Sequence, residues 1–145
     1  MRVVNHRVSH DYQILEKFEA GINLIGPEVK SVKGGHADLT GSFVRIVGSE
    51  AYLINAKIYP LPYARLDDYD ERRTRKLLLH KKEIISLRGK TEGANLSIVP
   101  LALYTKKNLV KVEIALAKGK KEYEKRETIK RKDMERELER ELRGK

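Results

Sequence analysis

Side chains that could carry out covalent chemistry are few in this sequence and form no recognisable catalytic pattern. The chain contains no cysteine, which excludes disulfides, thiolate metal sites and cysteine nucleophiles. Its four histidines, His6, His10, His36 and His80, are scattered. No pair of them combines the spacing and the intervening acid of a helical zinc motif. A phosphate loop ending in Gly-Lys-Ser/Thr and a Gly-x-Ser-x-Gly elbow are also missing. We therefore expect no metal site and no cofactor.

One acidic cluster supplies the main alternative. Asp67, Asp68, Asp70 and Glu71 lie almost side by side in the sequence. Clustered carboxylates can hold Mg²⁺ for phosphodiester cleavage, so a metal-dependent nuclease is one hypothesis. Metal sites usually gather their ligands from separate elements, however, and a solvated loop is the favoured interpretation of four nearly consecutive acids.

Two basic clusters are more informative. Residues 72–76 read Arg-Arg-Thr-Arg-Lys, and residues 118–121 read Lys-Gly-Lys-Lys. Arginine offers a planar fork to phosphates, and nearby Tyr12, Tyr104 or His80 could stack on bases. A solvated charged surface is the alternative for each cluster taken alone.

The charge balance of the whole chain agrees with a polyanionic partner. The 145 residues include 31 Lys+Arg and 21 Asp+Glu, a net charge of +10. Such an excess attracts phosphate, although a merely basic soluble protein shows it too. No segment approaches the roughly 18 apolar residues of a membrane span, and the N-terminus lacks a signal-like apolar stretch. We expect a cytoplasmic protein, monomeric and without membrane contact.

The elements that would position these groups are mostly short strands. Three pairs of strands flank turn-like segments: 14–18 with 22–25, 43–47 with 51–54, and 98–104 with 110–116. The last strand alternates apolar and polar residues, which indicates one buried and one wet face. Pro100 should lie at a bulge or an edge, because proline cannot donate to a ladder.

Two short helices should interrupt the strands. Residues 27–33 begin with proline and end at Gly34, and residues 81–88 end at Gly89. Many short strands with glycine turns favour a mainly β fold, a closed antiparallel barrel of the oligonucleotide-binding type with short flanking helices.

The composition changes after residue 117. We expect residues 1–117 to form an RNA-binding β-barrel domain and residues 118–145 to form a basic C-terminal tail. In the tail, 20 of 28 residues are charged, and Met134, Leu138 and Leu142 form a thin apolar seam with helical spacing. An isolated helix of this kind is marginal in water. The tail should be disordered alone and helical against a partner, or else a charged helix lying on the barrel.

Several segments together resemble those of a known family. They are Asn5-His6-Arg7, His10-Asp11-Tyr12, Phe18-Glu19-Ala20-Gly21-Ile22, Gly26-Pro27-Glu28-Val29-Lys30-Ser31, Gly41-Ser42-Phe43-Val44, Arg75-Lys76-Leu77-Leu78-Leu79-His80 and the run from Val112 to Lys121. Their order and spacing are similar to those of the small protein B family, the SsrA-binding proteins. This family partners transfer-messenger RNA in bacterial ribosome rescue.

The resemblance implies a function as well as a fold. It implies an adaptor that performs no covalent chemistry and binds the tRNA-like domain of transfer-messenger RNA. The adaptor supports charging of that RNA with alanine and delivers it to stalled ribosomes for trans-translation and peptide tagging. The tail would be unstructured when free and helical on the ribosome, in the decoding centre of the small subunit and the empty mRNA channel. A generic oligonucleotide-binding translation factor or ribosomal protein is the alternative.

The resemblance also implies which residues contact RNA. The family's RNA-contact positions fall on Glu19, Leu78, His80 and Lys111, and we add Arg75 and Lys76 from the first basic cluster. Leu78 could instead belong to the core. The ribosome-binding positions of the tail are Lys118, Gly119, Lys120, Lys121, Tyr123, Glu124, Lys125, Arg126, Ile129 and Met134.

Roles within the tail follow from the same resemblance. Gly119 would act as a hinge, Tyr123 would stack near decoding-centre bases, and Lys125 and Arg126 would hold ribosomal RNA phosphates. Met134 stands where the family often has an aromatic residue, so we expect an apolar contact there. Thr105 is a second departure of this kind.

Overall fold

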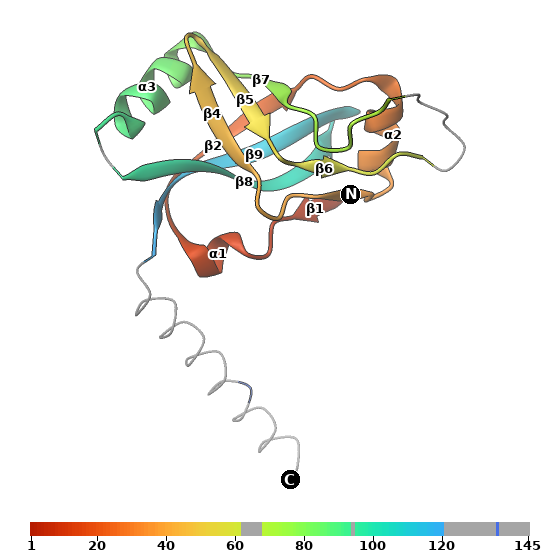
Figure 1. Ribbon diagram of the computed structural model, residues 1–145, viewed down its shortest axis with the longest axis horizontal. Coiled ribbons are helices and arrows are strands. Elements are labelled where there is room, and N and C mark those ends of the chain that lie inside the picture. The colour runs from red at the N-terminus through yellow and green to blue at the C-terminus, as the bar shows by residue number, and fades with distance from the viewer. Residues whose placement is uncertain (62–67, 94, 121–135, 137–145) are drawn as a thin grey trace.

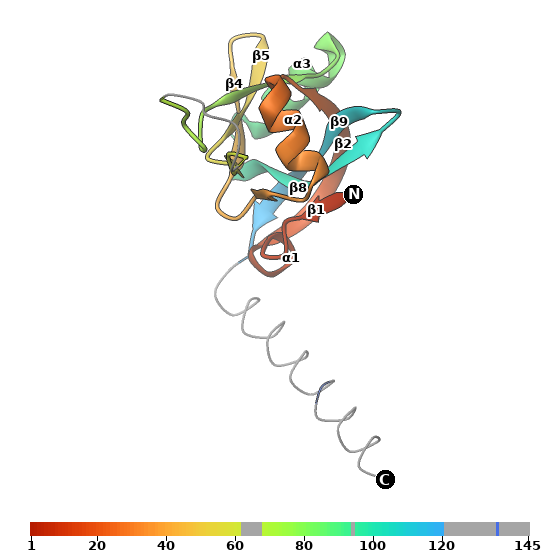
Figure 2. The ribbon, with the colours of Figure 1, turned by 90° about the vertical axis from the view of Figure 1, so that its right-hand side faces the viewer.

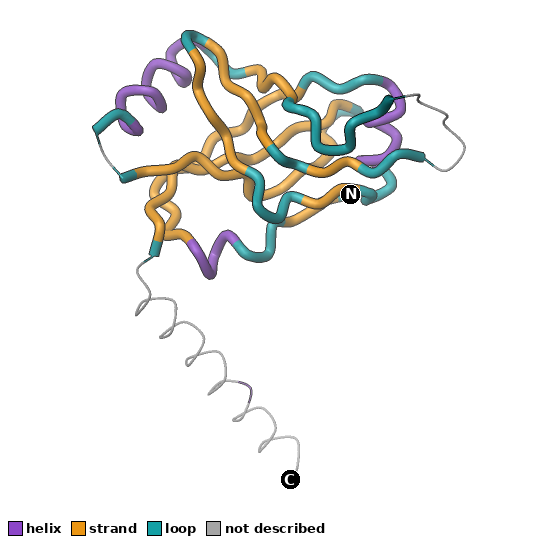
Figure 3. The backbone as a smooth tube through the Cα atoms, viewed as in Figure 1, coloured by secondary structure: helices purple, strands orange, loops and turns teal. Residues whose placement is uncertain are grey.

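Strands dominate the computed structural model, which describes residues 1–61, 68–93, 95–120 and Arg136 (Figure 3). The larger sheet contains β1 (Arg2–Val4), β2 (Tyr12–Ile22), β4 (Phe43–Val47), β5 (Glu50–Ile54), β7 (Arg75–Leu78), β8 (Leu96–Lys106) and β9 (Leu109–Gly119). A small second sheet pairs β3 (Ala37–Asp38) with β6 (Lys57–Ile58). The helices are α1 (Val8–Asp11), α2 (Gly26–Lys33) and α3 (Lys81–Thr91).

The larger sheet closes on itself (Figure 1). Its strand order is β1-β8-β4-β5-β7-β2-β9, and β8 pairs with β9 as well. Every pairing between described strands is antiparallel. The prediction of a mainly β, antiparallel fold is therefore confirmed, while its assignment to the oligonucleotide-binding class stays a prediction.

The core fills the inside of this ring. The largest fully buried apolar side chains come from five different strands and from the helices and loops that cover the ends. They are Leu39, Leu53, Ile58, Leu77, Leu87, Leu103, Ile114, Val32 and Val112. The equally buried Val99 belongs to a separate cluster with Val8 and Ala117. Within the part of the chain that the structure describes, no helix is long and apolar enough to cross a membrane.

Helices α2 and α3 lie toward opposite ends of the β-structure (Figures 1 and 2). Helix α2 matches its prediction, with Pro27 in its first turn and Gly34 at its C-cap. Helix α3 begins as predicted but does not stop at Gly89. It continues to Thr91, and the glycine with positive φ that follows it is Gly93, at +73°. A glycine inside a helix costs only about 1 kcal/mol, so Gly89 alone does not end it.

Strand β2 corrects a second expectation. The sequence predicted two strands, 14–18 and 22–25, separated by a turn at residues 19–21. The structure instead has one strand from Tyr12 to Ile22, because Glu19, Ala20 and Gly21 all pair with β9. Ala20 is 1% exposed, so the supposed turn is part of the core wall.

Of the two remaining strand predictions, the one for Pro100 is confirmed. The register of β8 against β9 shifts between Pro100 and Ala102, which places Pro100 at a bulge. The predicted alternation in β9 holds only over its first part: Val110, Val112 and Ile114 are buried and Lys111 is partly buried, but Ala115, expected on the wet face, is 0% exposed.

Strand β9 extends two residues past the predicted boundary at residue 117. The backbone N–H of Lys120 then donates to the carbonyl oxygen of Asp11 over 2.9 Å, and its Nζ donates to that of Ser9 over 2.7 Å. The described body thus includes residues 118–120. The division into body and tail stays a prediction, since residues 121–135 and 137–145 lie outside the described ones.

Candidate nucleic-acid interface

The sheet register aligns side chains from five strands on its outer surface. Arg2 of β1 pairs with Tyr104 of β8, and Tyr104 pairs with Lys111 of β9. Lys111 pairs with Gly21 of β2, and Gly21 pairs with Leu78 of β7. Directly opposed residues lie on the same face of a sheet, so these five residues form one line, here called the cross-strand row. Glu19 lies beside it, two residues before Gly21 on the same face of β2.

Leu78 belongs to the surface and not to the core. Its side chain is 56% exposed, whereas the preceding Leu77 is 2% exposed. Leu78 packs over Gly21, where an added Cβ would lie 3.2 Å from the Cβ of Leu78. The core interpretation that the sequence left open is wrong for this residue, and an apolar group is displayed between charged neighbours.

Glu19 is held by two donors. The Tyr104 hydroxyl donates to its Oε2, and the Nζ of Lys106 lies 3.3 Å from its Oε1. The hydrogen bond from Tyr104 and the neighbouring Lys106 lower the pKa of the Glu19 carboxyl against a smaller opposing effect of desolvation. Glu19 is therefore an ionised acceptor, with Lys106 and Lys111 nearby and the carboxylate of Glu113 directly opposite it on β9.

Lys111 and His80 are both accessible to a partner. Lys111 lies in the middle of the cross-strand row. His80 is exposed just before α3, and its backbone N–H donates to the Oε1 of Glu83 over 3.2 Å. Both positions agree with the predicted RNA contacts, which themselves stay predictions.

Lys76 also points outward but already has an anionic neighbour. Its Nζ lies 2.9 Å from the Oε1 of Glu50, which raises the pKa of Lys76. Glu50 also accepts a hydrogen bond from the Tyr52 hydroxyl over 2.5 Å. A phosphate at Lys76 would compete with this exposed ion pair, and such pairs contribute little stability.

Arg75 does not belong to the interface, and its predicted phosphate contact is wrong. The side chain is 0% exposed. Its Nε donates to the Oε2 of Glu28 over 2.8 Å and its Nη1 to the carbonyl oxygen of Ala56 over 2.8 Å. Its Nη2 donates to the Tyr69 hydroxyl over 3.2 Å and to the carbonyl oxygen of Glu71 over 3.0 Å. All of these partners are internal, so no donor fork faces solvent.

Arg73 of the first basic cluster is also engaged within the protein. It forms an ion pair with Glu28, whose side chain is 1% exposed. Desolvation would raise the pKa of Glu28, but hydrogen bonds from Arg73, Ile25 and Arg75 outweigh it and lower the pKa. The alternation of β7, with Arg75 and Leu77 inward and Lys76 and Leu78 outward, was the available signal that the sequence interpretation missed.

The described residues of the acidic cluster form local contacts in the loop that precedes β7. Asp70 Oδ1 accepts from the backbone N–H of Arg72 over 3.0 Å, and Glu71 lies 3.4 Å from the Nζ of Lys57. Among the described residues, no three His, Cys, Asp or Glu side chains are placed to share a metal ion. Asp67 lies outside those residues.

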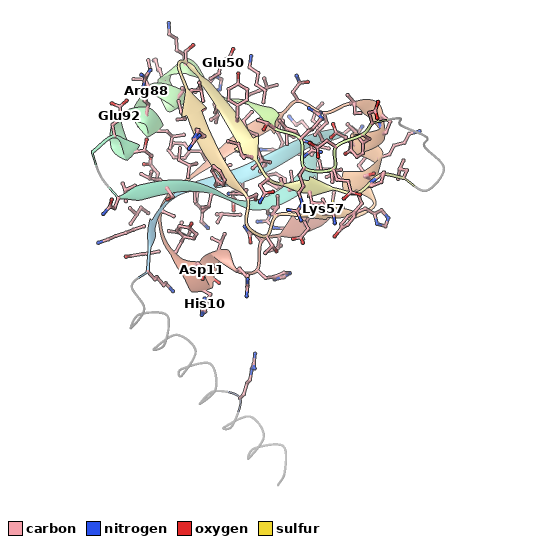
Figure 4. All side chains as sticks on the ribbon, in the orientation of Figure 1. His10, Asp11, Glu50, Lys57, Arg88 and Glu92 are labelled. Atoms are coloured by element: carbon pink, nitrogen blue, oxygen red, sulfur yellow. The ribbon has the colours of Figure 1, made fainter. Side chains whose placement is uncertain are left out.

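Three of the predicted tail residues are described. Lys118 and Gly119 are exposed at the end of β9, and Lys120 is bonded to α1 as given above. His10 and Asp11 of α1 lie beside this end of β9 (Figure 4). The other tail positions, Lys121, Tyr123, Glu124, Lys125, Arg126, Ile129 and Met134, lie outside the described residues.

A cleft lined by three arginines was not predicted. It has a volume of about 650 Å³, and Arg7, Arg45 and Arg88 line it together with Tyr12, Phe43 and the carboxylates of Asp11 and Glu92; Glu92 forms an ion pair with Arg88. The cleft shares no residue with the cross-strand row. Its arginines come from three separate segments, with Arg88 on α3 (Figure 4), so no local sequence pattern could have grouped them.

These features define a small β-rich protein with a face suited to a nucleic acid. The face consists of the cross-strand row on the closed antiparallel sheet and of Glu19 beside it. Comparison with known proteins then assigns the family. The chain belongs to the SmpB protein family, because the family model matches residues 2–144. This confirms the resemblance drawn from the sequence motifs.

Individual relatives agree with the assignment. An SsrA-binding protein of Sulfurihydrogenibium sp. (strain YO3AOP1) is 55% identical over 141 residues, which cover 97% of this chain and 93% of the relative. That of Aquifex aeolicus (strain VF5) is 51% identical over 142 residues, covering 97% and 90%. A chain in a solved structure, "tmRNA-SmpB: a journey to the center of the bacterial ribosome", is 48% identical with a TM-score of 0.71, covering 83% of this chain and 85% of that one.

Proposed function

We propose that this protein is an adaptor for transfer-messenger RNA. It binds the tRNA-like domain of that RNA and delivers it to stalled ribosomes for trans-translation and peptide tagging. The observation that carries the proposal is the family match along nearly the whole chain, residues 2–144. Relatives that are about half identical are SsrA-binding proteins, and the similar solved structure contains tmRNA and SmpB.

The body of the protein is the part that binds the RNA. The closed sheet acts as an oligonucleotide-binding-like barrel, and the RNA lies on the cross-strand row and Glu19. Lys111 and Lys76 offer cations to phosphates, His80 offers a ring and a hydrogen-bonding nitrogen, and Leu78 offers an apolar contact to a base or ribose. These roles require positioned side chains only, so the adaptor performs no covalent step and needs no cofactor.

The tail is the part that contacts the ribosome. The residues that follow Lys120 enter the decoding centre of the small subunit and the empty mRNA channel, where their positive charges meet ribosomal RNA. The protein works as a monomer in the cytoplasm, where its ribosomal partner is found. The bonds from Lys120 to Ser9 and Asp11 fix the point at which the tail leaves the body.

A truncation separates the two parts. We would end the chain after Lys120, which keeps β9 and its bonds to α1 intact. Affinity for full-length transfer-messenger RNA should stay within about twofold of the intact protein, while tagging on stalled ribosomes should be lost. Normal tagging by the truncated protein would contradict the assignment of the tail.

Competition with bulk tRNA tests the specificity of the body. A dedicated adaptor keeps its labelled transfer-messenger RNA in the presence of excess tRNA. Equal displacement by both RNAs would instead identify a generic oligonucleotide-binding translation factor or ribosomal protein. The same labelled RNA incubated with Mg²⁺ must remain intact, because cleavage would support the nuclease hypothesis.

A further inference from the structure

We propose that Tyr104 is a positioning residue for RNA recognition by Glu19: its hydroxyl holds the carboxylate in one orientation toward the bound RNA. The inference rests on the proposed function, and it adds a residue that the sequence motifs did not assign to this role. Tyr104 would act through Glu19 and through its hydroxyl.

The geometry places the donors on one side of the carboxylate. Tyr104 lies 85 residues from Glu19 in the sequence, on β8, while Glu19 lies on β2 with β9 between them. The Tyr104 hydroxyl donates to Oε2, and Lys106 from the end of β8 approaches Oε1 to 3.3 Å. Each carboxylate oxygen can accept more than one hydrogen bond. Both oxygens therefore retain capacity for a donor from RNA while β8 fixes their direction.

Tyr104 is itself held in place. The guanidinium carbon of Arg2 lies 5.4 Å from the centre of the Tyr104 ring, and an Nη2 of Arg2 lies 3.6 Å from the Oε1 of Glu113. One face of the ring is thus covered by a cation that is anchored in turn. Arg2 therefore holds the ring from one face, and the hydroxyl is the group through which Tyr104 acts on Glu19.

The protonation states of the pair are fixed as well. Burial and the hydrogen bond to Glu19 both raise the pKa of the Tyr104 hydroxyl. The same hydrogen bond is the largest cause of the lowered pKa of Glu19. Across the neutral range Tyr104 remains a donor and Glu19 remains an ionised acceptor, so their roles cannot exchange.

An oriented carboxylate selects the kind of RNA group that it contacts. An ionised glutamate only accepts hydrogen bonds, so it binds base N–H groups or ribose hydroxyls and repels phosphates. Nearby Lys106 and Lys111 attract phosphates. The direction of the Glu19 carboxylate therefore decides its effect on the RNA. Pointed at a base edge or a ribose it accepts a hydrogen bond, and pointed at the phosphate backbone it repels it. Holding that direction is the contribution of Tyr104.

A double-mutant cycle tests the inference with the full-length chain. Tyr104→Phe keeps the ring under Arg2 and removes the hydroxyl, and Glu19→Ala removes the acceptor of its hydrogen bond. We would measure affinity for the full-length transfer-messenger RNA transcript in both single variants and in the double variant. Tyr104→Phe should weaken binding about tenfold when Glu19 is present, as for a hydrogen bond to a charged group. It should have less than about a twofold effect in the Glu19→Ala background, where the hydroxyl has no acceptor at position 19.

The pH dependence of RNA affinity is a second measurement, and it should not change if Tyr104 has a merely structural role. Loss of the hydroxyl should return the pKa of Glu19 toward its ordinary value, so the affinity of Tyr104→Phe should begin to fall at a higher pH than that of the unmodified protein. Glu19→Ala has no titrating group at this position and supplies the baseline for protonation of the RNA. Tyr59→Phe is the matched control, because Tyr59 lies outside the row, and its affinity should be unchanged.

The outcomes separate the inference from the proposed function. Equal losses from Tyr104→Phe in both backgrounds, or no loss in either, would overturn the positioning role while the unmodified protein still binds the transcript. An unshifted pH profile would overturn it too. Absence of binding by the unmodified protein would overturn the proposed function and, with it, this inference.

Discussion

Gly21 of β2 and Leu78 of β7 face each other, and Leu78 packs so closely over the glycine that a larger residue at position 21 would be crowded. A Cβ at position 21 would lie 3.2 Å from the Cβ of Leu78 and 3.4 Å from its Cδ1. The φ angle of Gly21 is not in the positive range, so its backbone conformation does not require glycine. The glycine is needed for the closeness of Leu78, which therefore lies low over the sheet next to Lys111.

Gly21→Ala should move Leu78 and weaken RNA binding. We expect about a threefold loss of affinity for transfer-messenger RNA. The free energy of unfolding should change by less than about 1 kcal/mol, because alanine lowers the entropy of the unfolded chain and offsets the crowding. Fluorescence-based binding and denaturant unfolding check both values. Gly26→Ala, which meets nothing within 4 Å, is the control and should leave affinity unchanged. A Gly21→Ala variant with normal affinity would show that the exact place of Leu78 does not matter.

Lys111 and Leu78 should be distinguishable by salt dependence. Lys111→Gln removes one phosphate-neutralising charge, so the slope of log K against log salt should become shallower by about 0.7–0.9. Leu78→Ala removes apolar contact and should weaken binding severalfold at every salt concentration without changing the slope. Titrations between low and physiological salt measure both slopes. Identical slopes for Lys111→Gln and the unmodified protein would exclude a phosphate contact at Lys111.

Local features of this fold could be predicted from the sequence because they follow from local geometry. The alternation in β9 marks its buried face, Pro100 marks the bulge, and Pro27 marks the start of α2. Each depends on residues within a few positions of one another. Glycine was the least reliable guide, since Gly21 lies inside a strand and Gly89 lies inside a helix.

Contacts between distant segments could not be predicted in the same way. The basic cluster predicts a surface cation at Arg75, yet Arg75 contacts Glu28, which is 47 residues away in the sequence. Tyr104 meets Glu19 across 85 residues. Such pairs depend on which strands become neighbours and in which register, and this is fixed only when the sheet closes. Leu78, which the family resemblance places at an RNA contact, is exposed as such a contact requires, whereas the charge count alone placed Arg75 wrongly.

Glu28→Gln should destabilise the fold strongly. Glu28 neutralises Arg75 inside the protein, and both side chains are almost fully buried. Removing one partner leaves the other charge buried and unpaired, which costs about 3–5 kcal/mol. Chemical denaturation measures the loss. Glu16→Gln is the control, because Glu16 pairs with Lys90 at the surface with 44% of each side chain exposed. Glu16→Gln should change the free energy of unfolding by no more than about 0.5 kcal/mol. An equally small change in Glu28→Gln would contradict the prediction and mean that other groups compensate the buried charge of Arg75.

The same pair predicts the acid limb of the stability curve. Although desolvation raises the pKa of Glu28, the hydrogen bonds from Arg73, Ile25 and Arg75 lower it below the ordinary value of 4.5. A carboxyl whose pKa is lower in the folded state than in the unfolded state binds fewer protons when folded. Its contribution is therefore fully present above about pH 5 and is lost as the pH falls through the folded-state value. The difference in unfolding free energy between the unmodified protein and Glu28→Gln should be constant from pH 8 to about pH 5 and should shrink below that. Unfolding curves at a series of pH values measure it, and a difference that grew toward acid would require Glu28 to be protonated in the folded protein.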